Sequence, residues 1–372
     1  MSEKIKRTVT KILGSADIKI NGSRPWDIQV KNEDLYARVL SGGSLALGES
    51  YMDGWWDCKK LDQFFDKLLS AGLDYKVVNL WTLGAGYTKA KLINLQKGRR
   101  AFHIGKAHYD TGNKLFKNML DKRLAYSCGY WKDAKTLDAA QEAKLDLICR
   151  KIGLKKGMTV LDIGCGWASF VKFAAEKYGA KVLGVTVSNE QAEYARKICK
   201  GLPVEIRLQD YRDINQKFDR IVSVGMIEHV GVKNYNTYFE VAKRCLKDDG
   251  LFLLHTIGSL KSTSTTDPWI SKYIFPNSML PSLKQLTKAV EKKFVIEDIH
   301  NFSAYYDKTL MAWYDNFTKN WDKIKSDYDD RFYRMWVYYL LACAGSFRAR
   351  KNQLWQIVLS KEGIRHGYER LS

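Results

Sequence analysis

The sequence predicts an α/β protein with a doubly wound parallel sheet, preceded by a smaller mixed α/β domain. Apolar runs recur at 159–163, 181–187, 204–208, 218–224 and 250–257, and stretches with helical spacing separate them. Such alternation is typical of βαβ units and therefore of a parallel sheet. Gly164 and Gly166 follow the first run, at the strand-to-helix turn where such sheets bind nucleotides.

Length and composition support two folded domains. The chain has 372 residues, of which 45% are hydrophobic, so it can bury a substantial core and is not a disordered protein. Its net charge of +20 attracts polyanions, either nucleic acid or an anionic membrane surface. The seven cysteines are scattered without a CxxC pair, so we expect no metal site.

The sequence shows neither a membrane span nor a secretion signal. Its longest stretch without a charged residue, 335–347, is too short to cross a bilayer, which needs about 20 apolar residues. The N-terminal segment is basic but lacks the apolar run and cleavage site of a secretion signal. We therefore expect a cytoplasmic protein.

The N-terminal domain is expected at 1–92, followed by a basic linker at 93–107 and a second domain at 108–372. The N-terminal part combines an expected strand at 27–30, a glycine-punctuated segment at 42–56 and an amphipathic helix near 61–69. The linker lies in a stretch, 75–109, that has no acidic residue. It is either a solvated connector or a segment that contacts an anionic membrane.

Local signals define the helices between the expected strands. Thr136 can cap a helix that runs to about residue 152, and another helix is expected from about residue 170. Ser188 followed by Gln191 predicts a capping box. Gly179 and Gly201 stand where helix ends favour left-handed backbone.

The first strand turn favours S-adenosylmethionine over NAD. A dinucleotide site would have a third glycine where Ser169 stands and an acidic residue near 186–188, where there is none. Asp162, two residues before Gly164, can accept a hydrogen bond from the ammonium group of S-adenosylmethionine. The alternative is a tight turn with a capping aspartate.

Two residues after the third strand are candidates for the adenine group. Asp210 can accept from the adenine amino group, and Tyr211 offers an aromatic face. Asp210 is also placed to cap a loop, and that alternative stays open.

Four further residues are ambiguous when taken singly. Cys128 is typical of a small buried hydrophobe, His255 of a core histidine, and Tyr306 of a packing residue. Glu228 follows the fourth strand, where carboxylates are frequent for many reasons. Glu228 and His255, however, are expected at the carboxyl ends of adjacent strands, where ligands of such sheets bind.

Ten sequence blocks together indicate a family. They are HYDTGN from His108, AYSCGYW from Ala125, VLDIGCGW from Val160, GVTVSNEQ from Gly184, QDYRD from Gln209, FDRIVSVGMIEHVG from Phe218, LLHTIGS from Leu253, DPWISKYIFPN from Asp267, TLMAWYDNF from Thr309 and FRARKNQLWQ from Phe347. With these blocks the chain resembles the cyclopropane-fatty-acyl-phospholipid synthases of the mycolic acid cyclopropane synthase family. Ala168, Gly129 and Ser278 depart from residues common in that family, which affects only loop detail.

The resemblance implies a Rossmann-like class I S-adenosylmethionine-dependent methyltransferase domain at 108–372 and a lipid-associated domain at 1–92. It implies a bicarbonate ion held by Cys128, Glu228, His255, Tyr306 and the backbone at Ile257. It further implies cofactor contacts by Tyr126, Ser127, Gly164, Gly166, Thr186, Gln191, Asp210 and Tyr211. A homodimer is also typical of the family.

The implied chemistry explains these residue types. An isolated alkene is a poor nucleophile, so its methyl donor must be as electrophilic as a sulfonium and held close to it. The resulting carbocation needs a dry pocket, and aromatic side chains, 13% of this chain, can stabilise it. A bound bicarbonate can remove one proton from the newly added methyl group, and it can exchange afterwards. A carboxylate side chain at the same place could be alkylated permanently.

The implied substrate is an unsaturated phospholipid, so we expect peripheral association with the inner face of the cell membrane and no nucleic acid partner. The basic linker is one candidate docking surface. The acid-free stretch 331–361 is another, unless it is a core helix with charged ends. Rival functions are a related enzyme that methylates an amine or makes a branched or hydroxylated lipid, and a non-catalytic binder of lipid or nucleic acid.

Overall fold

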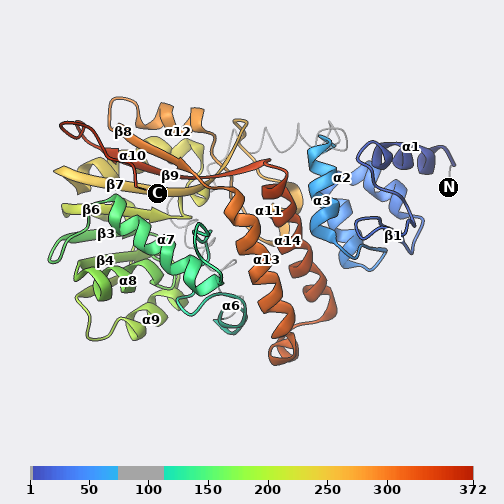
Figure 1. Cartoon of the computed structure of the whole chain (residues 1–372), viewed down its shortest axis with the longest axis horizontal. Helices are drawn as coiled ribbons and strands as arrows, with labels where there is room; N and C mark the ends of the chain where they lie inside the picture. The colour runs from blue at the N-terminus through green and yellow to red at the C-terminus, as the bar shows by residue number, and fades with distance from the viewer. Residues whose placement is uncertain (1–2, 74–112, 372) are drawn as a thin grey trace. The chain divides into compact units, whose positions relative to one another are not determined.

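The structure is a computed structural model that describes residues 3–73 and 113–371 (Figure 1). The chain forms two compact units, and each is discontinuous in sequence. Of the described residues, the helical unit comprises 3–73, 265–276 and 306–352, and the sheet unit comprises 113–264, 277–305 and 353–371. The domain bounds expected from the sequence, 1–92 and 108–372, stay a prediction. The expected linker at 93–107 lies outside the described residues.

The sheet unit contains the doubly wound sheet that the sequence predicts. Its strand order is β5-β4-β3-β6-β7-β9-β8. The strands are β3 (Thr159–Ile163), β4 (Lys181–Thr186), β5 (Val204–Leu208), β6 (Phe218–Val224), β7 (Leu246–Ser259), β8 (Val295–Asn301) and β9 (Asn352–Ser360). Strands β3 to β7 pair in parallel, and β8 is antiparallel to β9. The order reverses between β3 and β6, which is where sheets of this kind bind ligands.

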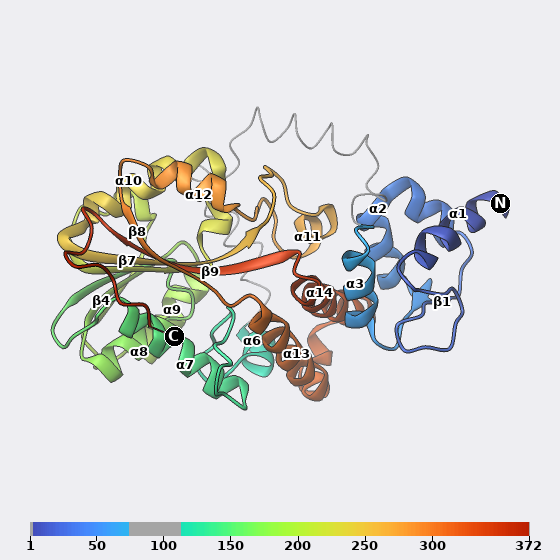
Figure 2. The same ribbon diagram turned by 45° about the horizontal axis from the view of Figure 1, so that its top comes forward.

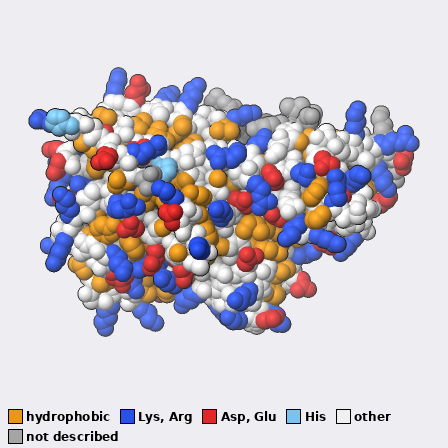
Figure 3. Space-filling view, in the orientation of Figure 1, with side chains coloured by type: hydrophobic (Ala, Val, Ile, Leu, Met, Phe, Trp, Pro, Cys, Tyr) orange, Lys and Arg blue, Asp and Glu red, His pale blue; other side chains and the backbone are white. Residues whose placement is uncertain are grey.

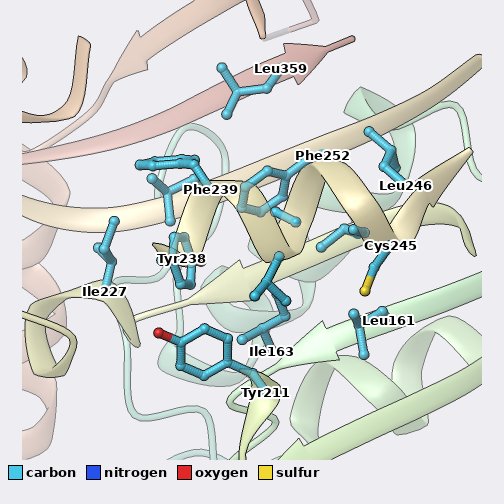
Figure 4. Close-up of a cluster of buried hydrophobic side chains, with 14 of the residues drawn as sticks. Leu161, Ile163, Tyr211, Ile227, Tyr238, Phe239, Cys245, Leu246, Phe252 and Leu359 are labelled. Atoms are coloured by element: carbon cyan, nitrogen blue, oxygen red, sulfur yellow. The ribbon is translucent and has the colours of Figure 1, made fainter. Parts of the chain in front are cut away.

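Helices cover both faces of this sheet (Figures 1 and 2). On one face lie α7 (Leu137–Lys151), α8 (Ser169–Tyr178) and α9 (Asn189–Ile198), and on the other α10 (Tyr235–Cys245) and α12 (Leu283–Val290). A hydrophobic core lies on each face of the sheet, and successive side chains of β3 point alternately into the two cores. Leu161 and Ile163 pack on the α10 side, and Val160 packs on the α7 side. Figure 4 shows the α10 side with the rings of Tyr238 and Phe239.

Most local predictions for this unit are confirmed. Strands β3, β5 and β6 have the predicted bounds, β4 is one residue shorter, and β7 is longer. Thr136 caps α7 by accepting from the Ala139 N–H, and Gly179 and Gly201 have φ values of 62° and 85°.

The predicted capping box at α9 is only half formed. The Ser188 side chain accepts from the Gln191 N–H, as predicted. The Gln191 side chain, however, accepts from the Thr186 hydroxyl at 2.8 Å instead of returning to the cap. Gln191 is therefore tied to the end of β4.

The helical unit is less β-rich than expected. Its elements are α1 (Glu3–Gly14), β1 (Gln29–Val30), α2 (Leu35–Met52), β2 (Trp56–Asp57), α3 (Leu61–Ser70), α11 (Pro268–Tyr273), the part of α13 (Ala304–Lys319) from Tyr306 on, η4 (Trp321–Lys323), η5 (Lys325–Asp327) and α14 (Asp330–Arg348). The strand expected at 27–30 is the two-residue β1, paired with β2. Most of the glycine-punctuated segment 42–56 lies in α2. This helix is kinked at Gly43, which has φ 57° and ψ −138°.

The remaining elements are short and belong to the sheet unit. They are α6 (Asn113–Met119), η1 (Tyr211–Asp213), η2 (Ile227–His229) and η3 (Val232–Asn234). Two of them, η1 and η2, follow the carboxyl ends of β5 and β6. Both therefore lie at the carboxyl end of the parallel strands, the end of the sheet at which ligands bind.

Basic side chains are spread over the face seen in Figure 3, with acidic ones among them. In the stretch 331–361, Arg331 pairs with Asp53, Arg334 with Asp57, Arg348 with Asp62 and Asp307, and Lys361 with Asp248. The middle of α14 is buried. The stretch therefore fits a core helix with charged ends better than a docking surface. Within the described residues, no helix is long and apolar enough to cross a membrane.

Candidate active site

A cleft opens at the carboxyl end of β3, where the strand order reverses. All nine residues expected to contact the cofactor line this cleft: Tyr126, Ser127, Asp162, Gly164, Gly166, Thr186, Gln191, Asp210 and Tyr211. They come from four separate segments of the chain: 126–127, 162–166, 186–191 and 210–211. The structure thus brings the predicted set together, while the contact of each with a cofactor stays a prediction.

The glycine turn fits a close approach of backbone to a ligand. Gly164 has φ 85°, and a Cβ atom there would lie 2.6 Å from Cγ of Met226. Gly166 has φ 53°. Both positions have left-handed backbone, which favours glycine over residues with a side chain. At Gly164 a side chain would also clash with Met226.

Asp162 is the buried charge of the cleft. Its side chain is 2% exposed, and Oδ1 accepts no hydrogen bond from any of the residues described. Burial raises the pKa of this carboxyl to about 7, and the positive charge of Lys144 opposes the rise. A buried acceptor without a donor is costly unless a ligand supplies one. Asp162 thus fits an ammonium group.

The far side of the cleft is formed by the ends of β4 and β5. Thr186 donates to Gln191 and accepts from the Ser188 N–H at 3.2 Å. Asp210 accepts from the backbone N–H of Arg212 at 3.0 Å and pairs with its guanidinium. The loop-capping alternative for Asp210 is therefore realised, and the same carboxylate also lines the cleft.

A second buried group lies at the carboxyl ends of β6 and β7. His255 is in register with Val224, the last residue of β6, and Glu228 follows in η2. Oε1 of Glu228 accepts from the N–H of Ile257 at 2.7 Å. Glu228, His255 and Ile257 thus meet at one edge of the sheet, as predicted. The Ile257 N–H, expected to face an anion, is engaged by Glu228, so its contact with an anion stays a prediction.

Burial sets the protonation of this pair. It raises the pKa of Glu228 to about 7, and Oε2 of the same carboxyl accepts no hydrogen bond from the part of the chain that is described. Burial, followed by the charges of Lys144 and Lys151, lowers the pKa of His255 well below its usual range. The imidazole is therefore neutral.

Gln356 contacts this imidazole. Its amide nitrogen lies 3.3 Å from Nδ1 of His255. In this orientation of the amide, its N–H donates to Nδ1, which places the ring proton on Nε2. Nε2 is buried and has no hydrogen-bond partner among residues 3–73 and 113–371. Among the residues described, Nε2 of His255 is thus an unused donor near the end of β7, and Oε2 of Glu228 is an unused acceptor just past the end of β6.

The other two predicted residues of this group are placed separately. Cys128 is fully buried, and its thiol lies 3.2 Å from the Gly129 carbonyl. Tyr306 belongs to the helical unit, where its ring packs on Phe347 at 4.5 Å and on Trp313 at 5.9 Å. A cage formed jointly by Cys128, Glu228, His255 and Tyr306 therefore stays a prediction.

Aromatic contacts connect the Cys128 segment to His255. The ring of Tyr130, two residues after Cys128, lies 5.4 Å from that of Phe302, which lies 5.9 Å from the His255 ring. On this side the His255 ring thus contacts an aromatic side chain, which suits chemistry from which water is excluded.

Three polar residues at this site were not predicted from the sequence. Gln141 and Lys144 lie on the buried face of α7, and Gln356 lies in the apolar strand β9. Each is a lone polar residue at a position whose helical or strand spacing predicts burial. That signal could have identified them.

Comparisons with known proteins identify relatives of this chain. The family model described as mycolic acid cyclopropane synthetase matches residues 96–357. The cyclopropane-fatty-acyl-phospholipid synthase of Escherichia coli K12 is 56% identical over 361 residues, 97% of this chain and 94% of that protein.

Solved structures show the same fold. The cyclopropane synthase MmaA2 of Mycobacterium tuberculosis has a TM-score of 0.66 and 30% identity, covering 70% of this chain and 98% of that one. The mycolic acid cyclopropane synthase CmaA1, solved in complex with SAH and CTAB, has a TM-score of 0.65 and 32% identity, with the same coverage.

Proposed function

The chain belongs to the mycolic acid cyclopropane synthetase family and is an S-adenosylmethionine-dependent methyltransferase, and from this premise we propose the reaction and its substrate. The protein transfers a methylene group to the cis double bond of an unsaturated acyl chain in a membrane phospholipid and forms a cyclopropane ring. Its relative of 56% identity carries a name that states this activity, and the similarity covers 97% of the chain.

One observation carries the proposal. The cofactor cleft begins at β3, and the ends of the next two strands, β6 and β7, carry two buried groups with unused hydrogen-bonding capacity among the residues described: Nε2 of His255 and Oε2 of Glu228. A methyltransferase that acts on an amine needs only a base for an ammonium proton. A buried donor and a buried acceptor at the ends of adjacent strands support our proposal of a small protonated anion such as bicarbonate.

The cleft residues have distinct parts in binding the methyl donor. Asp162 would accept from its ammonium group, the turn at Gly164 and Gly166 would let backbone approach it, and Asp210 and Tyr211 would contact its adenine. S-adenosylmethionine, when bound, supplies an electrophilic methyl group. The protein holds the donor in line with the double bond, and such positioning can contribute several kcal/mol.

The buried pair would hold bicarbonate. His255 donates through Nε2, and Glu228 accepts through Oε2, with its other oxygen fixed by the Ile257 N–H. We place Cys128 and Tyr306 at the same anion as further donors. Bicarbonate, when bound, supplies an exchangeable base for one proton of the newly added methyl group. Glu228 must be ionised to accept the hydroxyl proton of the anion, which requires a pH near or above its pKa of about 7.

Water exclusion completes the proposed mechanism. A carbocation on the acyl chain would be trapped as an alcohol by water, and Tyr130, Phe302 and His255 form an aromatic contact series on the side of Cys128. Aromatic faces stabilise positive charge without forming a bond to it. The chain thus has groups that suit a cation intermediate.

The substrate implies where the protein acts. We propose that it associates peripherally with the inner face of the cytoplasmic membrane, attracted by its net charge of +20. We further propose a homodimer.

Product analysis tests the proposal. Purified protein is incubated with S-adenosylmethionine, bicarbonate and vesicles of a cis-unsaturated phospholipid, and the released acyl chains are analysed by mass spectrometry and NMR. We expect a gain of one methylene with no added oxygen and the NMR signals of a cyclopropane. A methyl-branched alkene or an alcohol would instead support a related lipid methyltransferase, and an unchanged lipid would contradict the substrate.

A second assay tests bicarbonate. Activity should fall when carbonate is rigorously removed from the buffers and recover when it is added back. Turnover that is independent of carbonate would contradict the proposed base without affecting the assignment of the methyl donor.

A further inference from the structure

Lys144 is a buried cation inside the cofactor cleft that the proposed reaction does not use. It lies on α7, is 1% exposed and lines the cleft with Ser127 and Asp162. Its ammonium group donates to Oγ of Ser127 at 2.8 Å. Burial lowers the pKa of Lys144 to about 8, so the side chain is charged at neutral pH but is held at a cost.

The neighbours of Lys144 show which group needs its charge. The titratable groups that it faces are Asp121, Cys128, Asp162 and His255, and those facing Asp162 are Lys144, Cys165 and Tyr238. Burial raises the pKa of Asp121, and the N–H groups of Ala125 and Arg123, which donate to this carboxylate at 2.8 Å and 2.9 Å, oppose that rise more strongly than Lys144 does. Asp162 lacks such a donor at Oδ1 among the residues described, and Lys144 is the cation that opposes its protonation.

Gln141, like Lys144, hydrogen-bonds the chain segment around Ser127 to α7. The Gln141 amide, one turn earlier on α7, donates to the Ser127 carbonyl at 2.7 Å and to the Ala125 carbonyl at 3.3 Å. Gln141 and Lys144 therefore fix the segment that carries Tyr126 and Ser127 to one face of α7. The same helix thus orients one wall of the cleft and supplies its buried positive charge.

We propose that Lys144 is a positioning residue for the methyl donor: it orients Ser127 in the cleft and keeps the Asp162 carboxylate charged so that this carboxylate can accept from the donor's ammonium group. This inference rests on the proposed binding of S-adenosylmethionine through Asp162. It assigns to Lys144 an electrostatic part in binding and no part in the transfer step.

The pH dependence of donor affinity follows from this arrangement. With Lys144 charged, Asp162 binds the donor well above its pKa of about 7 and loses affinity below it. In Lys144→Met the carboxyl loses its stabilising charge, so a higher pH is needed to ionise it. At about pH 6 we expect Lys144→Met to bind the donor about tenfold more weakly than wild type. Above about pH 9, where Lys144 is itself neutral, we expect variant and wild type to bind the donor equally well.

Calorimetric titration of the full chain with S-adenosylmethionine at several pH values tests this. Lys151→Met is the matched control, because Lys151 is also buried on α7 with a pKa lowered to about 8, but it faces Asp298 and His300 instead of the cleft. Its affinity profile should match wild type. Lys144→Arg, which keeps the charge, should retain affinity at low pH.

A ligand without the amino acid group separates electrostatics from folding. Methylthioadenosine lacks the ammonium group, so its affinity should differ little between wild type and Lys144→Met. Equal weakening of both ligands at every pH, or a Lys144→Met profile that matches wild type, would overturn the inference.

Wild-type protein gives a test that does not depend on a variant that folds. Calorimetry in two buffers of different ionisation enthalpy should show proton release on binding near about pH 6, where Asp162 is protonated and the amino group of the donor is already charged. Absence of proton release near pH 6 would overturn the inference alone. Absence of any S-adenosylmethionine binding would instead overturn the proposed function as well.

Discussion

At the scale of single residues, two carboxyl groups are buried to a similar degree but have different expected functions. Asp162 and Glu228 are both nearly inaccessible, and burial raises the pKa of each to about 7. Asp162 lines an open cleft together with a buried lysine, whereas Glu228 accepts from the backbone N–H of Ile257 and does not line that cleft. These surroundings suit the first to a cationic ligand and the second to a protonated anion.

Changing Glu228 or His255 should stop turnover but leave donor binding intact. Glu228→Gln removes the charged acceptor and His255→Ala removes the Nε2 donor, and neither residue lines the cofactor cleft. We expect turnover to fall by at least about 100-fold in each variant, since positioned proton-transfer groups typically contribute that much. S-adenosylmethionine affinity, measured by calorimetry, should stay within about threefold of wild type. Normal turnover in both variants would remove these residues from the mechanism.

Asp162→Asn should stabilise the ligand-free protein at neutral and alkaline pH. Because the folded-state pKa of Asp162 is raised, its ionisation destabilises the native state progressively as pH rises from about 4 to about 7. The asparagine variant avoids that cost. Denaturant unfolding at pH 8 should show a gain on the order of 2 kcal/mol, with little gain near about pH 4.

The same variant should bind S-adenosylmethionine poorly, because an amide cannot offer a negative charge to an ammonium group. Equal unfolding free energies for variant and wild type at pH 8 would show that Asp162 is not held ionised at a cost, and would contradict its role as a buried acceptor.

At the scale of elements, the helical unit depends on a close approach between α3 and α14. A Cβ atom added at Gly345 would lie 2.6 Å from the backbone oxygen of Asp62 and 2.6 Å from Cβ of Phe65. Backbone cannot move aside as a flexible side chain can. Glycine at this position therefore sets how near the two helices lie.

Gly345→Ala should accordingly destabilise the protein by about 1–3 kcal/mol, as overpacked sites commonly do. Gly14→Ala is the matched control, because a Cβ atom there meets nothing within 4 Å. That variant should be neutral or slightly more stable, since alanine restricts the unfolded chain. Thermal unfolding of both variants makes the comparison, and equal melting temperatures would contradict the close-packing argument.

Sequence patterns predicted the elements of the sheet unit well and those of the helical unit less well. Buried parallel strands give apolar runs bounded by turn residues, so β3, β5 and β6 were predicted with correct bounds. In α2 the glycines suggested interruption, yet Gly48 is helical because its missing side chain leaves room for the Trp269 ring. Such tertiary packing has no local signal.

Site residues divide in the same way. The glycine turn and the strand ends predicted that Asp162, Gly164, Gly166, Asp210 and Tyr211 lie at the cleft, whereas Tyr126, Ser127, Thr186 and Gln191 were expected there only from the family resemblance. Lys144 was not assigned, because a lysine in a helix is normally solvated, although its spacing from the buried residues of α7 predicts that it faces inward. The pairing of Glu228 with the Ile257 N–H depends on the register of β6 and β7, which sequence spacing does not fix.

At the scale of the whole molecule, the net charge of +20 should govern how the protein meets a membrane. Binding to vesicles with anionic lipid should weaken strongly as salt rises from low to about 0.5 M, because the Debye length falls below about 5 Å. Co-sedimentation with anionic and with zwitterionic vesicles measures this, and the zwitterionic vesicles are the control. Binding that is insensitive to salt would indicate apolar insertion instead of charge-driven docking.

The central claim is that a sulfonium methyl group is added to a double bond and then gives up one of its own hydrogens. Donor labelled with three deuterium atoms on the methyl group tests it most directly, with cis-unsaturated phospholipid vesicles as acceptor. The account predicts a product that keeps two of the three deuterium atoms, both on a cyclopropane carbon by NMR. A product that keeps all three deuterium atoms, or one that has gained oxygen, would contradict it.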